Sequence, residues 1–154
     1  MQTFLPYPSF TLSAACLDTK RLGKQRVECA QMLNALGGRV LKLDGTPYSY
    51  PKSVPNHPAT RMWRGFEQAL ALYGLIVCQE WKLRGYTNNI DFLPSVGGTI
   101  SFPLWLGDEA FHRSHRSNLI RKLPEHYGKL WPDVPNDLPY VWPTLQGHSN
   151  EHSA

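Results

Sequence analysis

Hydrophobic residues recur along this chain with the spacing of amphipathic helices, and no stretch alternates apolar and polar positions as a β-strand does. A short helix is predicted to begin after Ser9 or Thr11, since either side chain can cap it, and to end near Leu17. Longer helices, each followed by a residue that stops a helix, are predicted over residues 18–36, 58–84 and 108–122. The pattern therefore predicts an all-α fold.

Long irregular loops are expected between these helices, because proline, glycine and asparagine gather over residues 44–57 and 86–107. A chain of 154 residues fits one compact domain, which we expect to cover residues 1–143. Residues 144–154 are polar and predicted to form a flexible tail. The longest apolar stretch, Ala69–Cys78, is too short to span a bilayer, which takes roughly 18 residues. We therefore expect a soluble, cytoplasmic protein.

The three cysteines lie in apolar, helix-like surroundings without a C-x-x-C motif. An odd number of such cysteines is typical of small buried side chains in a reducing compartment. A cysteine nucleophile remains the alternative.

Positive charge is concentrated in two segments of the chain, which has a formal net charge of +4 and an isoelectric point near 9.1. Residues 112–129 hold five Lys or Arg against one acid, and a second cluster lies at residues 20–26. Clustered cations that displace counterions from phosphates are typical of nucleic-acid binding, although many basic faces are only solvated. The charge pattern makes double-stranded DNA a candidate partner.

The predicted helix after Asp18 places Arg21, Gln25 and Glu28 on one polar face, through their i, i+4 and i+7 spacing. A carboxylate in this setting can stabilise a cationic sugar or an iminium ion, or act as a general base. An ordinary surface helix with a Lys24–Glu28 ion pair has the same pattern, so both interpretations stand.

Two H-R-S triplets in tandem make the next helix polar over residues 112–117. His112, His115 and Arg116 share a face, which we expect to meet a ligand, with DNA phosphate as the first candidate. His112 and His115 are also one turn apart, as metal ligands often are. The neighbouring arginines would repel a dication, so no metal is predicted there.

His57 lies directly before the predicted helix start at Pro58, where the local field disfavours a protonated imidazole. Arg61 follows in the first turn of that helix. Some of the aromatic residues near the basic segments are candidates to stack on an exposed base, although most aromatics in a small domain belong to the core; they are Trp63, Tyr127, Trp131, Tyr140 and Trp142.

In order and spacing, these motifs resemble the pyrimidine-dimer DNA glycosylase (endonuclease V) family, over about residues 1–143. Arg21 and Arg26 match two arginines of the family's early helix. Asn56-His57 before a helix that ends at Arg84-Gly85-Tyr86 matches a Gly-His before a similar helix, and Tyr127-Gly128-Lys129 matches an aromatic, basic motif. The chain is also similar to relatives that begin M-Q-T-F-L-P-Y-P.

The resemblance implies an all-helical enzyme that flips a base out of DNA, attacks the sugar with an amine, releases the base and then cleaves the strand. Family members expose the amine of a threonine after Met1 is removed, whereas the large Gln2 implies that Met1 is retained here. An α-amine, with an ordinary pKa of about 7.7–8.0, is chemically suited to this role. Leu22 occupies the position of the family's catalytic glutamate, so Glu28 or Gln25 would substitute and strand cleavage stays open.

We therefore predict a DNA glycosylase, without a cofactor and acting as a monomer, that excises a damaged or modified pyrimidine. Either the amine of Met1 or an activated water is the nucleophile. The residues predicted for chemistry and for lining the pocket are Met1, Arg21, Gln25, Glu28, His57, His112 and His115. Those predicted to contact DNA are Lys24, Arg26, Arg61, Arg113, Arg116, Lys122, Tyr127 and Lys129. A non-catalytic DNA-binding protein and a metal-dependent nuclease are the alternatives.

Overall fold

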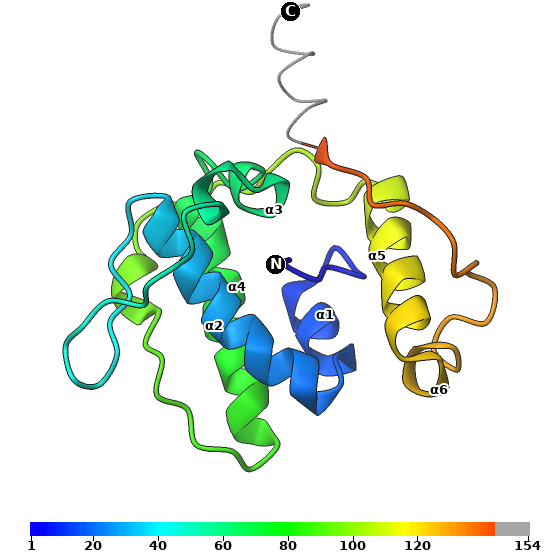
Figure 1. Ribbon diagram of the computed structural model, residues 1–154, viewed down its shortest axis with the longest axis horizontal. Coiled ribbons are helices and arrows are strands. Elements are labelled where there is room, and N and C mark those ends of the chain that lie inside the picture. Colours follow the sequence, from blue (N-terminus) through cyan, green and yellow to red (C-terminus); the bar gives the residue numbers. More distant parts are fainter. Residues whose placement is uncertain (144–154) are drawn as a thin grey trace, which may run out of the picture.

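The computed structural model describes residues 1–143, and these residues form an all-α fold, as predicted (Figure 1). Their α-helices are α1 (Phe10–Cys16), α2 (Thr19–Ala35), α3 (Pro58–Arg61), α4 (Glu67–Leu83), α5 (Glu109–Lys122) and α6 (Pro124–Tyr127). Two short 3-10 turns, Val54–Asn56 and Leu93–Ser95, lie in the long loops. The tail predicted for residues 144–154 lies outside the described residues.

The predicted helix starts at Ser9, Asp18 and Asp108 are confirmed by their capping bonds. Each of these side chains accepts a hydrogen bond from a backbone N–H in the first turn of its helix, which satisfies a donor that the helix leaves free. Gly37 follows the end of α2 with a φ of 96°, a left-handed conformation that glycine adopts without strain.

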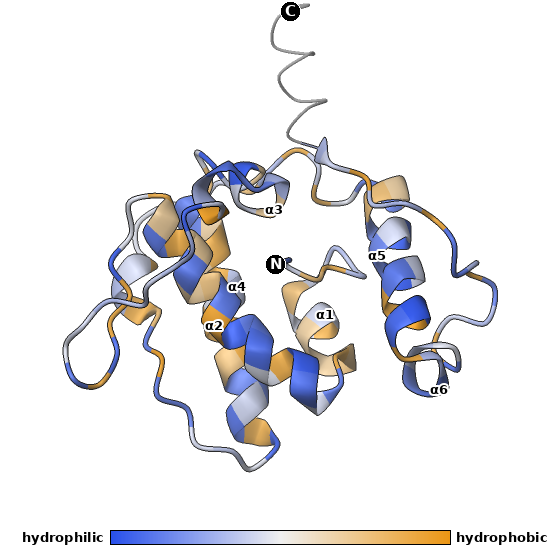
Figure 2. Ribbon diagram, viewed as in Figure 1, coloured by the Kyte–Doolittle hydropathy of each residue, from blue (hydrophilic) through white to orange (hydrophobic). Residues whose placement is uncertain are grey.

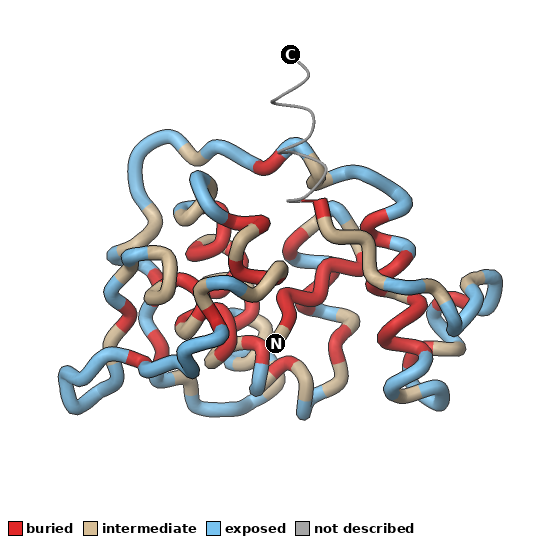
Figure 3. The backbone as a smooth tube through the Cα atoms, turned by 45° about the horizontal axis from the view of Figure 1, so that its top comes forward, coloured by how far each residue is buried: buried red, intermediate tan, exposed pale blue. Residues whose placement is uncertain are grey.

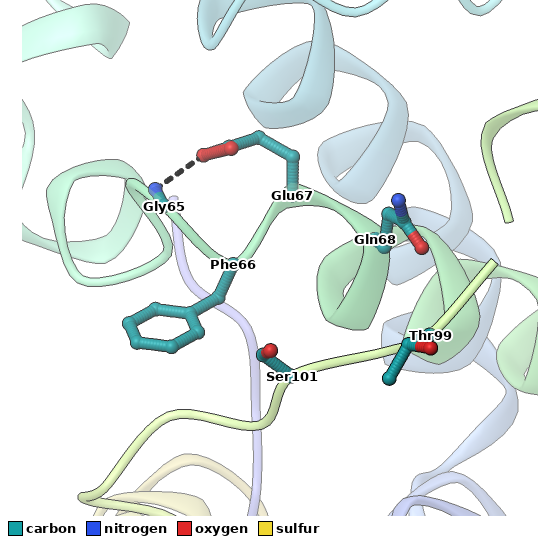
Figure 4. A pocket seen from close by; sticks show the side chains of 6 residues that line it. All are labelled: Gly65, Phe66, Glu67, Gln68, Thr99 and Ser101. Atoms are coloured by element: carbon teal, nitrogen blue, oxygen red, sulfur yellow. Dashed lines mark hydrogen bonds between the residues drawn. The ribbon is translucent and has the colours of Figure 1, made fainter. Parts of the chain in front are cut away.

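The prediction of one continuous helix from residue 58 to 84 is wrong, because the chain breaks between α3 and α4. Gly65 lies in this break with a φ of 88°, which no helix accommodates. The Gly65 N–H then donates to the Glu67 carboxylate at the start of α4, as Figure 4 shows. A hollow of about 330 Å³ lies beside the break, and Phe66, Gln68, Thr99 and Ser101 complete its lining (Figure 4).

Helices α2 and α4 pack side by side and form one half of the molecule, while α5 and α6 form the other half (Figure 1). Gly23 lets the two long helices approach closely, since a Cβ there would lie 2.9 Å from the Trp81 ring. Gly74 lets the loop that follows α4 pack closely against that helix, because a Cβ at Gly74 would lie 2.7 Å from the Phe92 ring. Large side chains here would force the helices apart.

The N-terminal segment runs through the middle of the molecule, between these halves (Figure 1). Residues 2–6 are all buried, although they form no regular secondary structure. Figure 3 shows other buried segments gathered around the N-terminus. Within residues 1–143, no helix is both long enough and apolar enough to cross a membrane.

Candidate active site

The backbone of the N-terminal segment is held by side chains from three helices. Gln25 of α2 accepts from the Phe4 N–H at 2.8 Å and donates to the Gln2 carbonyl at 2.8 Å. Tyr73 of α4 donates to the Phe4 carbonyl. An extended segment without a sheet partner must find other partners for its buried N–H and C=O groups, and these side chains provide them.

Helix α5 completes this support through both predicted histidines. The Leu5 N–H donates to Nδ1 of His115 at 3.0 Å, and Nδ1 of His112 lies 2.8 Å from the Leu5 carbonyl. Nε2 of His112 accepts from the Gly107 N–H at 2.9 Å, so its Nδ1 carries the proton and donates to Leu5. Arg116, one turn further, donates to the Pro6 carbonyl. The two imidazoles are therefore neutral and clamp one residue from both sides.

This clamp differs from the expectation that the polar face of α5 meets DNA. Figure 2 colours much of α5 as hydrophilic, yet His112 and His115 are fully buried. Burial lowers the pKa of both histidines, and that of His115, which also lies near His112, falls to about 3. Nδ1 of His115 and both ring nitrogens of His112 bind the backbone of Leu5 and Gly107, so the pair holds the N-terminal segment. Within residues 1–143, no group of three or more His, Cys, Asp or Glu is arranged to bind a metal.

The clamp predicts that the protein loses stability in mild acid. The unfolded chain binds a proton at His115 near the ordinary pKa of about 6.5, whereas the folded protein binds one only near 3. The contribution of His115 is therefore complete above pH 6.5 and is lost as the pH falls toward 3, by up to about 1.4 kcal/mol per pH unit.

The change His115→Asn keeps an acceptor for the Leu5 N–H and removes the titration. We expect it to reduce the difference between the free energies of unfolding in urea at about pH 7 and at about pH 5. The matched control is His126→Asn on exposed α6, which should leave this difference unchanged. Equal pH dependence in wild type and His115→Asn would contradict the clamp.

The side chains that hold the N-terminal segment also place the α-amine of Met1 beside the carboxylate of Glu28. The nitrogen of Met1 lies 3.7 Å from Oε2 of Glu28, and the same oxygen accepts from the Gln2 N–H at 3.3 Å. The side chains of Met1 and Glu28 are 13% and 10% exposed, so the pair is largely shielded from water but reaches the surface. An amine and a carboxylate in this position can perform nucleophilic and proton-transfer chemistry together.

The predicted polar face of α2 is present, but only part of it reaches the amine. Glu28 contacts Met1, while Gln25 is buried beneath the N-terminal segment as a backbone partner. Arg21, two turns before Glu28, forms an ion pair with Asp18 at 3.2 Å. Leu22 is fully buried in the core, which explains why no carboxylate occupies that position.

His57 lies near the amine, at the N-terminus of α3. Its Nδ1 accepts from the Ala59 N–H at 3.0 Å, which caps the helix. Burial, and then the positive charge of the Met1 amine, lower the pKa of His57. The predicted lowering of the His57 pKa is confirmed, and its causes are burial and the charge of the Met1 amine.

Two aromatic residues of the C-terminal segment, Tyr140 and Trp142, pack against His115 and His57. The ring of Trp142 is 6.0 Å from His57 and 5.4 Å from Tyr140, whose ring is 5.4 Å from His115. The sequence indicated both only as two of several aromatic residues that could stack on an exposed base. Polar side chains of α5 hold the backbone on both sides of Tyr140. Ser117 accepts from the Leu138 N–H at 3.0 Å, Asn118 donates to the Leu138 carbonyl at 3.1 Å, and Ser114 accepts from the Val141 N–H at 3.2 Å.

Several residues predicted to contact DNA are engaged inside the protein instead. Arg26 donates to Asn88 at 2.9 Å and stacks on the Trp81 ring, and Arg116 pairs with Glu109 in addition to its bond to Pro6. Tyr127 is fully buried, where its hydroxyl binds Asp18 at the start of α2 and burial raises its pKa. Lys24, Arg113, Lys122 and Lys129 are exposed, and Arg61 is half-buried.

The cysteines agree with the interpretation as small core residues. All three carry free thiols, with Cys29 and Cys78 buried and Cys16 half-buried. Burial raises the pKa of each thiol, to about 12 for Cys16 and about 11 for Cys78. None therefore has the lowered pKa of a reactive thiolate.

Comparison with known proteins identifies the family of this chain. A family model described as pyrimidine dimer DNA glycosylase matches residues 1–94, which include the N-terminal segment, α2 and His57 but neither α5 nor the C-terminal aromatics. No curated protein and no solved structure matches the chain. The match covers more than half of the chain and contains the amine–carboxylate pair, so the chain belongs to the pyrimidine dimer DNA glycosylase family.

Proposed function

We propose that the protein is a DNA glycosylase that excises a damaged or modified pyrimidine, with the α-amine of Met1 as its nucleophile. The observation that carries this proposal is the position of that amine, 3.7 Å from the Glu28 carboxylate at the edge of a buried segment. The family match supports the glycosylase class and a DNA substrate. It leaves the base, the nucleophile and strand cleavage as parts of the proposal.

In the proposed reaction, the lone pair of the amine forms a bond to C1′ of the flipped nucleoside. The bond between C1′ and N1 of the pyrimidine breaks, and its electron pair leaves with the base. The amine gives up a proton, which Glu28 accepts and which finally resides on the released base. The second amine proton passes to the ring oxygen as the sugar opens, which leaves an imine between Met1 and C1′.

Glu28 has two tasks in this scheme. Its negative charge stabilises the cationic sugar while the glycosidic bond breaks, and its oxygen receives the amine proton. In the family, the catalytic glutamate directly follows the residue that matches Arg21, where this chain has Leu22. In this scheme Glu28 takes the role of that glutamate. If the same carboxylate then removes a proton from C2′ of the imine, the 3′ phosphate leaves and the strand is cut.

Incubation of the protein with duplexes that carry a pyrimidine dimer, a modified pyrimidine or an abasic site, with and without borohydride, tests the proposal. Base release together with a borohydride-trapped covalent adduct is the expected result. Release of base without an adduct would favour water as the nucleophile. Failure to release any base would overturn the glycosylase proposal and leave the non-catalytic DNA-binding alternative.

The exposed cations predict salt-sensitive binding of duplex DNA. We propose Lys24, Arg113, Lys122 and Lys129 as phosphate contacts, with Arg61 near His57. For Lys129→Ala, we expect weaker binding across all sequences and a salt slope of log K reduced by about 1. Fluorescence anisotropy at several salt concentrations measures both, with the exposed Lys42→Ala as control. An unchanged slope would remove Lys129 from the interface.

A further inference from the structure

Gln2 is a buried residue with one polar group that has no partner. The residue is 5% exposed. Its N–H donates to Glu28, its carbonyl accepts from Gln25, and its side-chain oxygen accepts from the Thr3 N–H at 3.0 Å. Its side-chain nitrogen has no hydrogen-bond partner among residues 1–143. Buried donors nearly always have an acceptor, so this amide is expected to meet one in a complex.

The side chain of Tyr140 provides a second donor at the same place. Burial raises the pKa of its hydroxyl, and the Gln2 amide and the charges of Arg121 and Arg21 oppose that rise from close by. The phenol therefore keeps its proton at neutral pH. Tyr140 is half-buried, as is Met1, whereas the Gln2 amide is enclosed behind them.

The two donors belong to the surroundings of the nucleophile. The Gln2 N–H and the Met1 nitrogen share one oxygen of Glu28, and both Gln2 and Glu28 act on the pKa of Tyr140. In a pyrimidine nucleoside, the carbonyl oxygen O2 is attached to the carbon next to N1, the atom that separates from C1′. When the N1–C1′ bond breaks, its electron pair enters the ring and negative charge develops on O2. The Glu28 carboxylate repels that charge, so a different group must stabilise it.

We propose that the Gln2 amide, together with the Tyr140 hydroxyl, donates hydrogen bonds to O2 of the leaving pyrimidine and stabilises the charge that develops there. This inference rests on the proposed function and deepens it. Glu28 acts on the sugar and the amine, while Gln2 and Tyr140 act on the base. The arrangement selects bases that carry a carbonyl beside the glycosidic nitrogen, which are the pyrimidines.

The test compares two reactions of the full-length protein that differ only in whether a base must leave. Gln2→Met removes both amide donors and keeps a large second residue, so Met1 is retained. Gln2→Glu keeps the acceptor for the Thr3 N–H but loses the donors, and serves if Gln2→Met does not fold. Tyr140→Phe removes the second donor, and Gln79→Met on the exposed side of α4 is the matched control.

Single-turnover cleavage of the N1–C1′ bond in a pyrimidine-dimer duplex, where the freed base stays joined to its neighbour and is released after the dimer is reversed by light, is measured beside borohydride trapping on an abasic duplex, where no base leaves. Gln2→Met is expected to slow base release by about 10²-fold or more, the usual effect of losing a donor to a developing oxyanion, while trapping stays within about twofold of wild type. Tyr140→Phe should change the rates in the same direction, and Gln79→Met should not.

Base release at the wild-type rate in Gln2→Met would overturn the proposal. An equal loss of release and of trapping would also overturn it, because Gln2 would then only position Met1. The proposed function fails in a different way: wild type itself would then cleave no N1–C1′ bond in the dimer duplex, or would cleave it without forming an adduct on either duplex.

Discussion

Glu28→Gln is expected to lower the rate of base release by about 10²–10⁴-fold, the range that proton transfer by a positioned side chain contributes. The variant keeps an oxygen that accepts from the Gln2 N–H, so the N-terminal segment should stay in place. It loses the negative charge 3.7 Å from the Met1 nitrogen and the ability to accept its proton. Single-turnover cleavage of the N1–C1′ bond in a pyrimidine-dimer duplex, read after the dimer is reversed by light, measures the effect.

The matched control for this change is Glu125→Gln, which alters an exposed carboxylate in the first turn of α6. It should release base at the wild-type rate. Adduct formation on an abasic duplex should fall in Glu28→Gln along with base release, in contrast to Gln2→Met. If Glu28→Gln released base within about threefold of wild type, Glu28 would not be the carboxylate of the reaction.

Extending the chain by three residues ahead of Met1 is expected to abolish adduct formation and to lower base release by about 10²-fold or more. The extension turns the Met1 amine into an amide and displaces the new terminal amine from Glu28. Misplacing a reacting group by only about 1 Å can lower the reaction rate by about 10²-fold. Borohydride trapping on an abasic duplex, followed by gel separation, measures the adduct.

The same three residues added after Ala154 provide the control, since they leave the amine unchanged. The intact mass establishes that Met1 is the first residue of wild type and of the control, and that the three added residues precede Met1 in the extended protein. Thermal unfolding establishes that the extended chain is folded. An extended protein that still forms the adduct would show that another amine is the nucleophile. Normal base release without an adduct would assign the step to water.

Much of the fold was predictable because its signals are local. Caps at Asp18 and Asp108 and the glycine after α2 depend on a few neighbouring residues, so the sequence indicates them directly. The break at Gly65 was missed, because an isolated glycine in an apolar helical pattern is usually tolerated. Its φ of 88° depends on how α3 and α4 pack, which no local pattern contains.

The site was predictable only in part, because its main feature joins distant segments. The spacing on α2 indicated Glu28, but its contact with Met1 joins the middle of α2 to the first residue of the chain. The polar row on α5 was interpreted as a ligand surface, since polar helix faces usually meet solvent or a ligand. Here it binds irregular backbone instead, through His112 and His115 on one side and Ser117 on the other.

The clamp on Leu5 also determines when during synthesis the N-terminal segment can be fully held. Leu5 and His115 are separated by 110 positions, so the ribosome has made most of the chain before the partner of Leu5 exists. Closing such a long loop comes late in folding, because its entropy cost precedes any gain from the contact. The Met1 amine therefore leaves the ribosome among the first groups of the chain, whereas the contacts of α5 that hold the segment behind it form among the last.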